Sequence, residues 1–180
     1  MKKKAALMLV AMALIASAAA AQKRDTKEAR PSPNAAVSQT IGTTDVSVAY
    51  GRPAVKGRNV WGDLAPYGKV WRTGANECST FTANKDVLVE GKRLAAGTYC
   101  LFTIPTATEW TWIFSKNATQ WGAFSYKEAE DALRVTSKPL ASSHPHEWLT
   151  LSFEHLEPGA ATLALHWEKL AVPLKIQEAK

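Results

Sequence analysis

The chain has 180 residues, of which 22 are Lys or Arg and 16 are Asp or Glu, so its formal net charge is +6. Three of the lysines lie at positions 2–4, ahead of an apolar run, which leaves 19 basic residues scattered among the 16 acidic ones. This small excess of positive charge, without a cluster of basic residues, does not indicate a nucleic-acid-binding surface, so no nucleic-acid partner is expected.

The N-terminus has the three parts of a secretory signal peptide. Lys2, Lys3 and Lys4 form a positive segment, residues 5–18 are apolar, and the alanines at 19–21 match a signal peptidase site. An uncleaved membrane anchor is the alternative, but the apolar run is shorter than the roughly 20 residues that span a bilayer. We therefore predict a signal peptide over 1–21, periplasmic or secreted localisation, and no stable membrane insertion after cleavage.

The next segment, residues 22–35, is polar, charged and interrupted by Pro31 and Pro33. It cannot bury enough apolar surface to offset the entropy of ordering it. We predict a flexible polar tether over 22–35, followed by one domain over 36–180.

Apolar residues in this domain recur with a period of two, as in strands that bury one face. Clear runs are Val46, Val48 and Tyr50; Tyr99, Leu101 and Thr103; Leu149, Leu151 and Phe153; and Leu163, Leu165 and Trp167. Turn residues such as those at 158–159 separate the runs. The pattern predicts a mostly β domain, a single antiparallel β-sandwich or jelly-roll-like barrel.

Two local signals modify this pattern. Residues 125–131 carry Ser125 and Glu128 at capping-box spacing, which predicts one short helix. Pro173 lies within the last apolar alternation and lacks a ladder donor, so its strand should lie at an edge or carry a bulge.

The chain has two cysteines, Cys78 and Cys100, both in the part that would be exported. An exported pair favours a disulfide over a catalytic or metal site. Two small buried thiols are the alternative.

The segment 50–77 is long, weakly periodic and rich in cationic and aromatic side chains. Arginine suits carboxylate, sulfate or phosphate, and Trp and Tyr rings stack on sugars or aromatic groups. The candidate ligand-binding residues are Arg52, Arg58, Trp71, Arg72, Asn76 and Glu77. The structural alternative is that these arginines stack on tryptophans and pair with carboxylates, and so hold the loop onto the sheet.

Two other groups could carry function. The aromatic segment 121–126 could form the opposite wall of the same cleft, although packing over a sheet end is favoured. His144, His146 and Glu147 share one loop, but nothing fixes their spacing, so no metal site is predicted. No cofactor is expected either, because the chain has no phosphate or dinucleotide fingerprint.

Several strings extend these observations: VSQTIGTTDVSVAYGRPAVKGR, VWGDLAPYGKVWRTGANECSTFT, AAGTYCLFTIP, QWGAFSY and EWLTLSFE. With its GKVWRTGANE core at 68–77, the chain resembles the bacterial family DUF2911 over residues 32–176. The resemblance implies an exported, β-rich envelope protein and brings no activity and no catalytic residue. Cys78 and Cys100 stand where that pattern would have small residues, so a disulfide here would be a local reinforcement.

Three functions remain open. The leading hypothesis is an exported envelope module that binds a small polar or anionic molecule, a saccharide or a carboxylate. The first alternative is a hydrolase-type enzyme with Glu77 as acid or base and Arg72 as charge stabiliser. The second is a structural or interaction module that presents Trp121, Phe124 and Tyr126 to another protein.

Overall fold

The computed structural model describes residues 24–180, and the predicted signal peptide lies outside this part. In chain order the strands are β1 (Asn34–Ile41), β2 (Thr44–Gly51), β3 (Ser79–Ala83), β4 (Val87–Val89), β5 (Lys92–Leu94), β6 (Gly97–Ile104), β7 (Trp110–Ser115), β8 (Asp131–Ser137), β9 (Leu140–Glu157) and β10 (Ala160–Glu178). One 3-10 turn, η1 (Glu128–Glu130), precedes β8.

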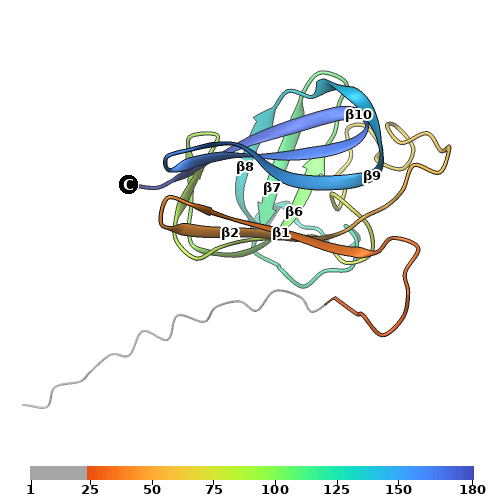
Figure 1. Ribbon diagram of the computed structural model, residues 1–180. Coiled ribbons are helices and arrows are strands. Elements are labelled where there is room, and N and C mark those ends of the chain that lie inside the picture. Colours follow the sequence, from red (N-terminus) through yellow and green to blue (C-terminus); the bar gives the residue numbers. More distant parts are fainter. Residues whose placement is uncertain (1–23) are drawn as a thin grey trace, which may run out of the picture.

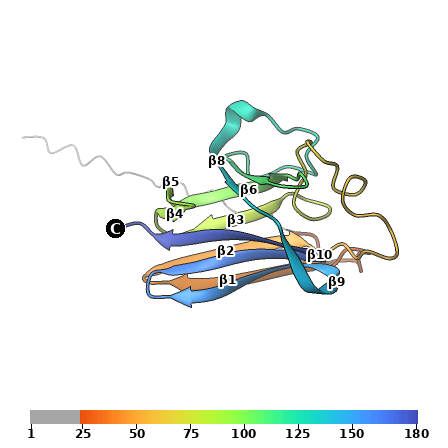
Figure 2. The ribbon, with the colours of Figure 1, turned by 90° about the horizontal axis from the view of Figure 1, so that it is seen from above.

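The strands form two antiparallel sheets that pack on each other (Figures 1 and 2). The order in the larger sheet is β1-β2-β3-β6-β7-β8, and the order in the smaller sheet is β5-β4-β10-β9. β1 lies beside β9 and β10 at one edge, and β8 lies beside β5 and β10 at the other. The predicted β-sandwich is confirmed, and the two sheets do not join into a closed barrel.

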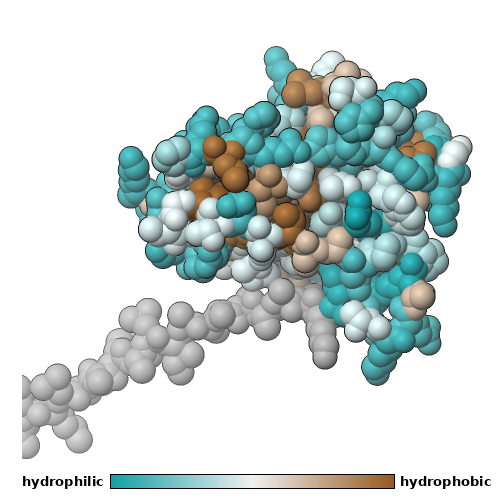
Figure 3. Space-filling view, in the orientation of Figure 1, coloured by the Kyte–Doolittle hydropathy of each residue, from teal (hydrophilic) through white to brown (hydrophobic). Residues whose placement is uncertain are grey.

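The core lies between the sheets and follows the period-two pattern. Val46, Val48 and Tyr50 of β2 are at most 3% exposed, and Leu163 and Leu165 of β10 are fully buried. The outward positions are mostly polar, and hydrophobic residues form only small separate patches on the face shown in Figure 3. Alternation along each strand therefore identifies the buried face correctly.

β6 departs from this pattern because both of its faces are buried. Leu101 packs in the main core, whereas Cys100 and Phe102 on the other face form a second cluster with Ile113. The Tyr126 ring packs edge-on against Phe102 at 5.3 Å between centroids, so the segment between β7 and β8 covers this face. A strand covered on both sides has a continuous apolar run, which is what residues 99–102 show.

The helix predicted over 125–131 is wrong, because most of this segment is not helical. Only the turn η1 forms, and no side chain caps it. Asp131 instead accepts hydrogen bonds from the Tyr126 hydroxyl at 2.7 Å and from Arg134 Nε at 2.6 Å, which holds it at the start of β8. These two contacts favour the extended backbone over a second helical turn.

Pro173 lies where the lack of a backbone donor is tolerated. β10 pairs with β9 as far as Ala171 and with β4 from Ile176 onward, so Pro173 falls between the two ladders. The expected edge strand or bulge is not what accommodates Pro173: β10 lies between β4 and β9, and its register shifts all precede Ala171, but no ladder needs a donor at the point where the two pairings meet.

The disulfide prediction is confirmed. Cys78 and Cys100 are bonded, with their Cα atoms 5.7 Å apart, and both are fully buried. The bond joins the residue before β3 to the middle of β6.

The segment assigned to the tether makes specific contacts. β1 begins at Asn34, so the last two residues of 22–35 are strand. Arg24 Nη2 donates to the carbonyl oxygens of Cys78 at 2.6 Å and Ala49 at 3.1 Å. The boundary between tether and domain stays a prediction. In residues 24–180 no helix has the length and apolar character needed to cross a membrane.

Candidate functional site

The long connection between β2 and β3 crosses one end of the sandwich and is tied to both sheets (Figure 2). The Leu149 amide of β9 donates to the Pro53 carbonyl oxygen at 3.0 Å. Trp71 exchanges two backbone hydrogen bonds with Thr103 of β6, at 2.8 and 2.9 Å. The connection therefore closes the open end between the sheets with a fixed backbone.

Four tryptophans pack together at this end of the sandwich. Trp61 and Trp71 come from the connection, Trp110 from β7 and Trp167 from β10. The rings of Trp71 and Trp167 stack at 5.8 Å and 11°, and Trp61 meets Trp110 edge-on at 5.1 Å. Among the described residues, the buried indole N–H groups of Trp61, Trp110 and Trp167 have no acceptor. Buried donors without partners are rare in folded proteins, so these three indole groups are an unusual feature of this cluster.

A cavity of about 130 Å³ opens above this cluster, and we call it the Arg72 cavity. Its walls include Ser32, Arg58, Leu64, Trp71, Arg72 and Trp167. Arg58 donates to the carbonyl oxygens of Ala54 at 2.7 Å and Val55 at 3.1 Å. Both arginines of the cavity lack an ion pair with any carboxylate of residues 24–180.

Arg72 is the least compensated of these cations. The only hydrogen bond of its side chain to the described chain runs from Nε to the Gly74 carbonyl oxygen at 3.3 Å. Burial lowers the pKa of the Arg72 guanidinium, and no neighbouring carboxylate offsets this effect. A partly desolvated cation with free donors attracts an anion that can supply the missing acceptors.

The backbone next to Arg72 is strained. Thr73 is buried and has φ of 52°, which is a costly conformation for a β-branched residue. Its hydroxyl contacts the Thr103 hydroxyl at 3.1 Å, and its carbonyl oxygen accepts from Ser79 Oγ at 2.7 Å. Strain that is held in place by several contacts concentrates at functional sites, which adds support for this position.

A second cavity of about 300 Å³, which we call the Phe124 cavity, adjoins the first. It is lined by Leu64, Val70, Trp71, Arg72, Ala123 and Phe124. Leu64, Trp71 and Arg72 belong to both cavities, so Arg72 lies between a mostly polar hollow and a more apolar one. Residues 123 and 124 come from the aromatic segment 121–126, which thus faces the connection between β2 and β3 at this point.

The structure brings three of the six predicted site residues together. Arg58, Trp71 and Arg72 line the Arg72 cavity, whereas Arg52, Asn76 and Glu77 do not. Arg52 instead donates to the Leu149 carbonyl oxygen at 2.9 Å and to Thr150 Oγ1 at 2.7 Å, which ties the connection to β9.

Asn76 does not line the cavity but binds a residue that does. Its amide donates to the Ser32 carbonyl oxygen at 3.2 Å, and Ser32 lines the Arg72 cavity. Sequence reasoning missed Ser32, Leu64 and Trp167 because no local pattern links them to Arg72. Phe124 was predicted as part of the segment 121–126, a possible opposite wall of this cleft, and as one residue of a possible protein contact.

Glu77 lies in a closed ion pair. It is 4% exposed, and Arg30 binds both of its oxygens, at 2.7 and 2.9 Å, while Arg24 lies 3.4 Å away. Burial alone raises the pKa of Glu77, but the Arg30 hydrogen bonds and the charges of both arginines outweigh it and lower the pKa below its ordinary value. An ionised, enclosed carboxylate is not poised to exchange a proton at neutral pH.

We expect the Glu77→Gln variant to melt at a lower temperature than wild type at neutral pH. Because the pKa is depressed in the folded chain, the contribution of Glu77 is present above the ordinary carboxyl pKa and is lost as the pH falls through the folded value. The melting temperatures of the two proteins should therefore converge as the pH falls below the ordinary carboxyl pKa. Melting curves over this range, with Glu157→Gln as an exposed control, measure the effect, and a difference that does not change with pH would contradict it.

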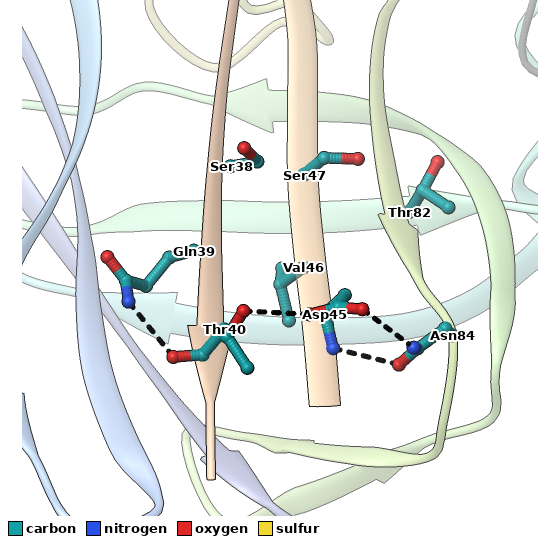
Figure 4. Close-up of a pocket in the computed structure, with 8 residues that line it drawn as sticks. All are labelled: Ser38, Gln39, Thr40, Asp45, Val46, Ser47, Thr82 and Asn84. Atoms are coloured by element: carbon teal, nitrogen blue, oxygen red, sulfur yellow. Dashed lines mark hydrogen bonds between the residues drawn. The ribbon is translucent and has the colours of Figure 1, made fainter. Parts of the chain in front are cut away.

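A wider hollow of about 590 Å³ lies on the outer face of β1, β2 and β3 (Figure 4). Two cross-strand rows of polar residues line it: Ser38, Ser47 and Thr82, and Thr40, Asp45 and Asn84. In the second row Asp45 accepts from Thr40 Oγ1 at 2.8 Å and from Asn84 Nδ2 at 3.2 Å. Because the groups of the second row satisfy one another and no cation is among the lining residues, this surface gives a weaker indication of an anionic ligand than the Arg72 cavity does.

Three of the histidines stack in a row on the β9–β10 hairpin. The rings of His144 and His146, and those of His146 and His166, have centroids 4.8 Å apart. His166 Nε2 lies 2.7 Å from Glu154 Oε1. No three His, Cys, Asp or Glu side chains within residues 24–180 are grouped so that they could hold a metal ion.

Fold and site together define a two-sheet β-sandwich with a cationic cavity at one end. The chain belongs to the DUF2911 family, described as "Protein of unknown function", whose match covers residues 32–176. None of the curated proteins and none of the solved structures compared with the chain matches it.

Proposed function

We propose that this domain is an exported binding module for a small oxyanion, held by Arg72 at the end of the sandwich. The observation that carries the proposal is the state of Arg72: partly desolvated, without a carboxylate partner among the described residues, and with a single weak hydrogen bond. A buried charge is costly unless a counter-charge accompanies it, so an anionic ligand would relieve this cost.

The groups around the cavity favour the anionic side of the hypothesis over the saccharide side. The side chains of Arg58 and Arg72, which line the cavity, carry donors only. A sugar hydroxyl needs both donors and acceptors around it, whereas carboxylate, phosphate and sulfate oxygens only accept. The cavity is smaller than the roughly 300 Å³ at which sites for larger organic ligands begin, so it suits a small anion or the charged head of a longer molecule.

We expect the Arg72→Gln variant to bind acetate, phosphate or sulfate at least about ten-fold more weakly than wild type, because it loses charged hydrogen bonds. Its melting temperature should stay close to that of wild type, since the removed charge has no partner in the described chain. Titrations followed by tryptophan fluorescence at constant ionic strength measure the affinity.

Arg93→Gln is the matched control for this comparison. Arg93 lies on β5, is exposed and pairs with Asp86, so this variant removes the same charge away from the residues that line the Arg72 cavity. It should leave the affinity for the anions unchanged. Equal binding by wild type and Arg72→Gln, or a large loss of stability in Arg72→Gln, would support a scaffold role for Arg72 instead.

Export is the second part of the proposal. It draws support from the predicted signal peptide over 1–21 and from the Cys78–Cys100 disulfide, which is typical of oxidising compartments. Expression with the native leader, followed by fractionation and mass measurement of the product, tests it. A chain that keeps residues 1–21 and stays with the cytosolic fraction would refute export.

The two other functions have less support. The hydrolase alternative needs Glu77 beside a second titratable group across a cavity, and Glu77 lines neither cavity and pairs with Arg24 and Arg30. The interaction-module alternative draws on the exposure of Trp121 and Phe124, at 55% and 84%. Both stay predictions.

A further inference from the structure

The Phe124 cavity combines one cation with an apolar wall. Apart from Arg72 and Trp71, its lining residues are Leu64, Val70, Ala123 and Phe124. The Phe124 ring is 84% exposed, although burying a phenylalanine side chain stabilises a protein by about 2 kcal/mol. An exposed ring beside a concave apolar wall offers contact area to a bound molecule.

Gly122 brings the ring and the cation to the same place. A Cβ atom at this residue would lie 3.0 Å from Phe124 Cε2 and 3.1 Å from Arg72 Nη1. The residue also has φ of 65°, which glycine adopts without strain. The absence of a side chain here allows the guanidinium and the aromatic ring to approach one point of the backbone from two sides.

The two cavities therefore differ in chemistry and share Arg72. The Arg72 cavity has room and donors for a charged head, and the Phe124 cavity has room and apolar surface for what is attached to it. A free inorganic anion would leave the apolar wall unused, and a sugar would place hydroxyl groups against Leu64, Val70 and Phe124 without partners.

We propose that the natural ligand is an organic monocarboxylate with a short apolar or aromatic tail. Its carboxylate binds Arg72, and its tail lies across Leu64 and Val70 and against the Phe124 ring. This inference rests on the proposed oxyanion site and specifies the class of anion that the site selects.

The test compares acetate, butyrate, hexanoate and 3-phenylpropionate, with inorganic phosphate alongside, on the full mature chain. Each added methylene that is buried should tighten binding by about four-fold, and 3-phenylpropionate should bind more tightly than acetate. Tryptophan fluorescence reports binding because Trp71 lines both cavities, and the NMR signals of Gly122 and of the Arg72 Nε–H group report its location.

Phe124→Ser separates the tail from the head. This variant should bind acetate with the affinity of wild type, but its affinity should rise much less with the chain length of the carboxylate. Phe124→Leu should keep part of that rise in affinity. Trp121→Ser is the matched control, because Trp121 is exposed in the same segment and does not line the cavity. Since Phe124 and Trp121 are exposed, both serine variants should fold.

The outcomes distinguish the two proposals. Equal affinities for all carboxylates, or an unchanged chain-length dependence in Phe124→Ser, would overturn the inferred tail site and leave the oxyanion site standing. If wild type bound neither the carboxylates nor phosphate, the proposed function itself would fail.

Discussion

Replacing Trp167 by alanine is expected to lower the free energy of unfolding by about 4 kcal/mol. The side chain is 1% exposed, stacks on Trp71 and meets Trp61 edge-on at 5.7 Å, so its removal leaves a cavity that the rigid ends of two sheets cannot close. Because Trp167 also lines the Arg72 cavity, oxyanion binding should weaken in the same variant. Urea denaturation gives the change in free energy.

Trp148→Ala is the control for this prediction. Trp148 is 38% exposed, so its loss should cost no more than about 1 kcal/mol. Losses of equal size in the two variants would show that the tryptophan cluster does not carry the packing that we assign to it.

Reducing the Cys78–Cys100 disulfide should lower the free energy of unfolding by about 3 kcal/mol. The bond joins residues 22 apart, and its loss frees the corresponding loop in the unfolded chain. Both sulfurs are fully buried, so reduction removes the cross-link while the packing volume stays nearly the same. The measurement is urea denaturation with and without reductant.

A Cys78→Ala, Cys100→Ala double variant is the control, because its stability should not respond to the reductant. It should unfold at or below the urea concentration that unfolds reduced wild type, since it also loses the packing of both sulfurs. If the oxidised and reduced forms of wild type unfolded at the same urea concentration, the cross-link would make no contribution to stability.

Period-two alternation predicted the sandwich because it depends only on neighbours along one strand. Val46, Val48 and Tyr50 needed no knowledge of the opposite sheet to be assigned to a buried face. The failures have a common cause. The segment 125–131 has the residues of a capped helix, but Tyr126 and Arg134 bind Asp131 and favour a strand there. Tertiary contacts outweigh a local preference of this size.

The candidate site was predicted only in part, for a related reason. Arg58, Trp71 and Arg72 were found because they occur in one long, polar and aromatic segment. Composition could not tell which cations already have a partner. Arg52 binds β9, a strand about a hundred positions away, and Glu77 is taken by Arg30 from the segment assigned to the tether.

By itself, the sequence determined that this is a β domain whose strands bury one face, favoured a disulfide, and pointed to the connection between β2 and β3 as the place of a candidate site. Alternation, turn residues and cysteine count are local properties, which folding preserves. Only the tertiary structure decided that Arg72 is partly buried without a carboxylate partner in residues 24–180 and that Phe124 lies beside it. Charge pairing and burial depend on distances between residues far apart in the chain, and the path of the backbone sets those distances.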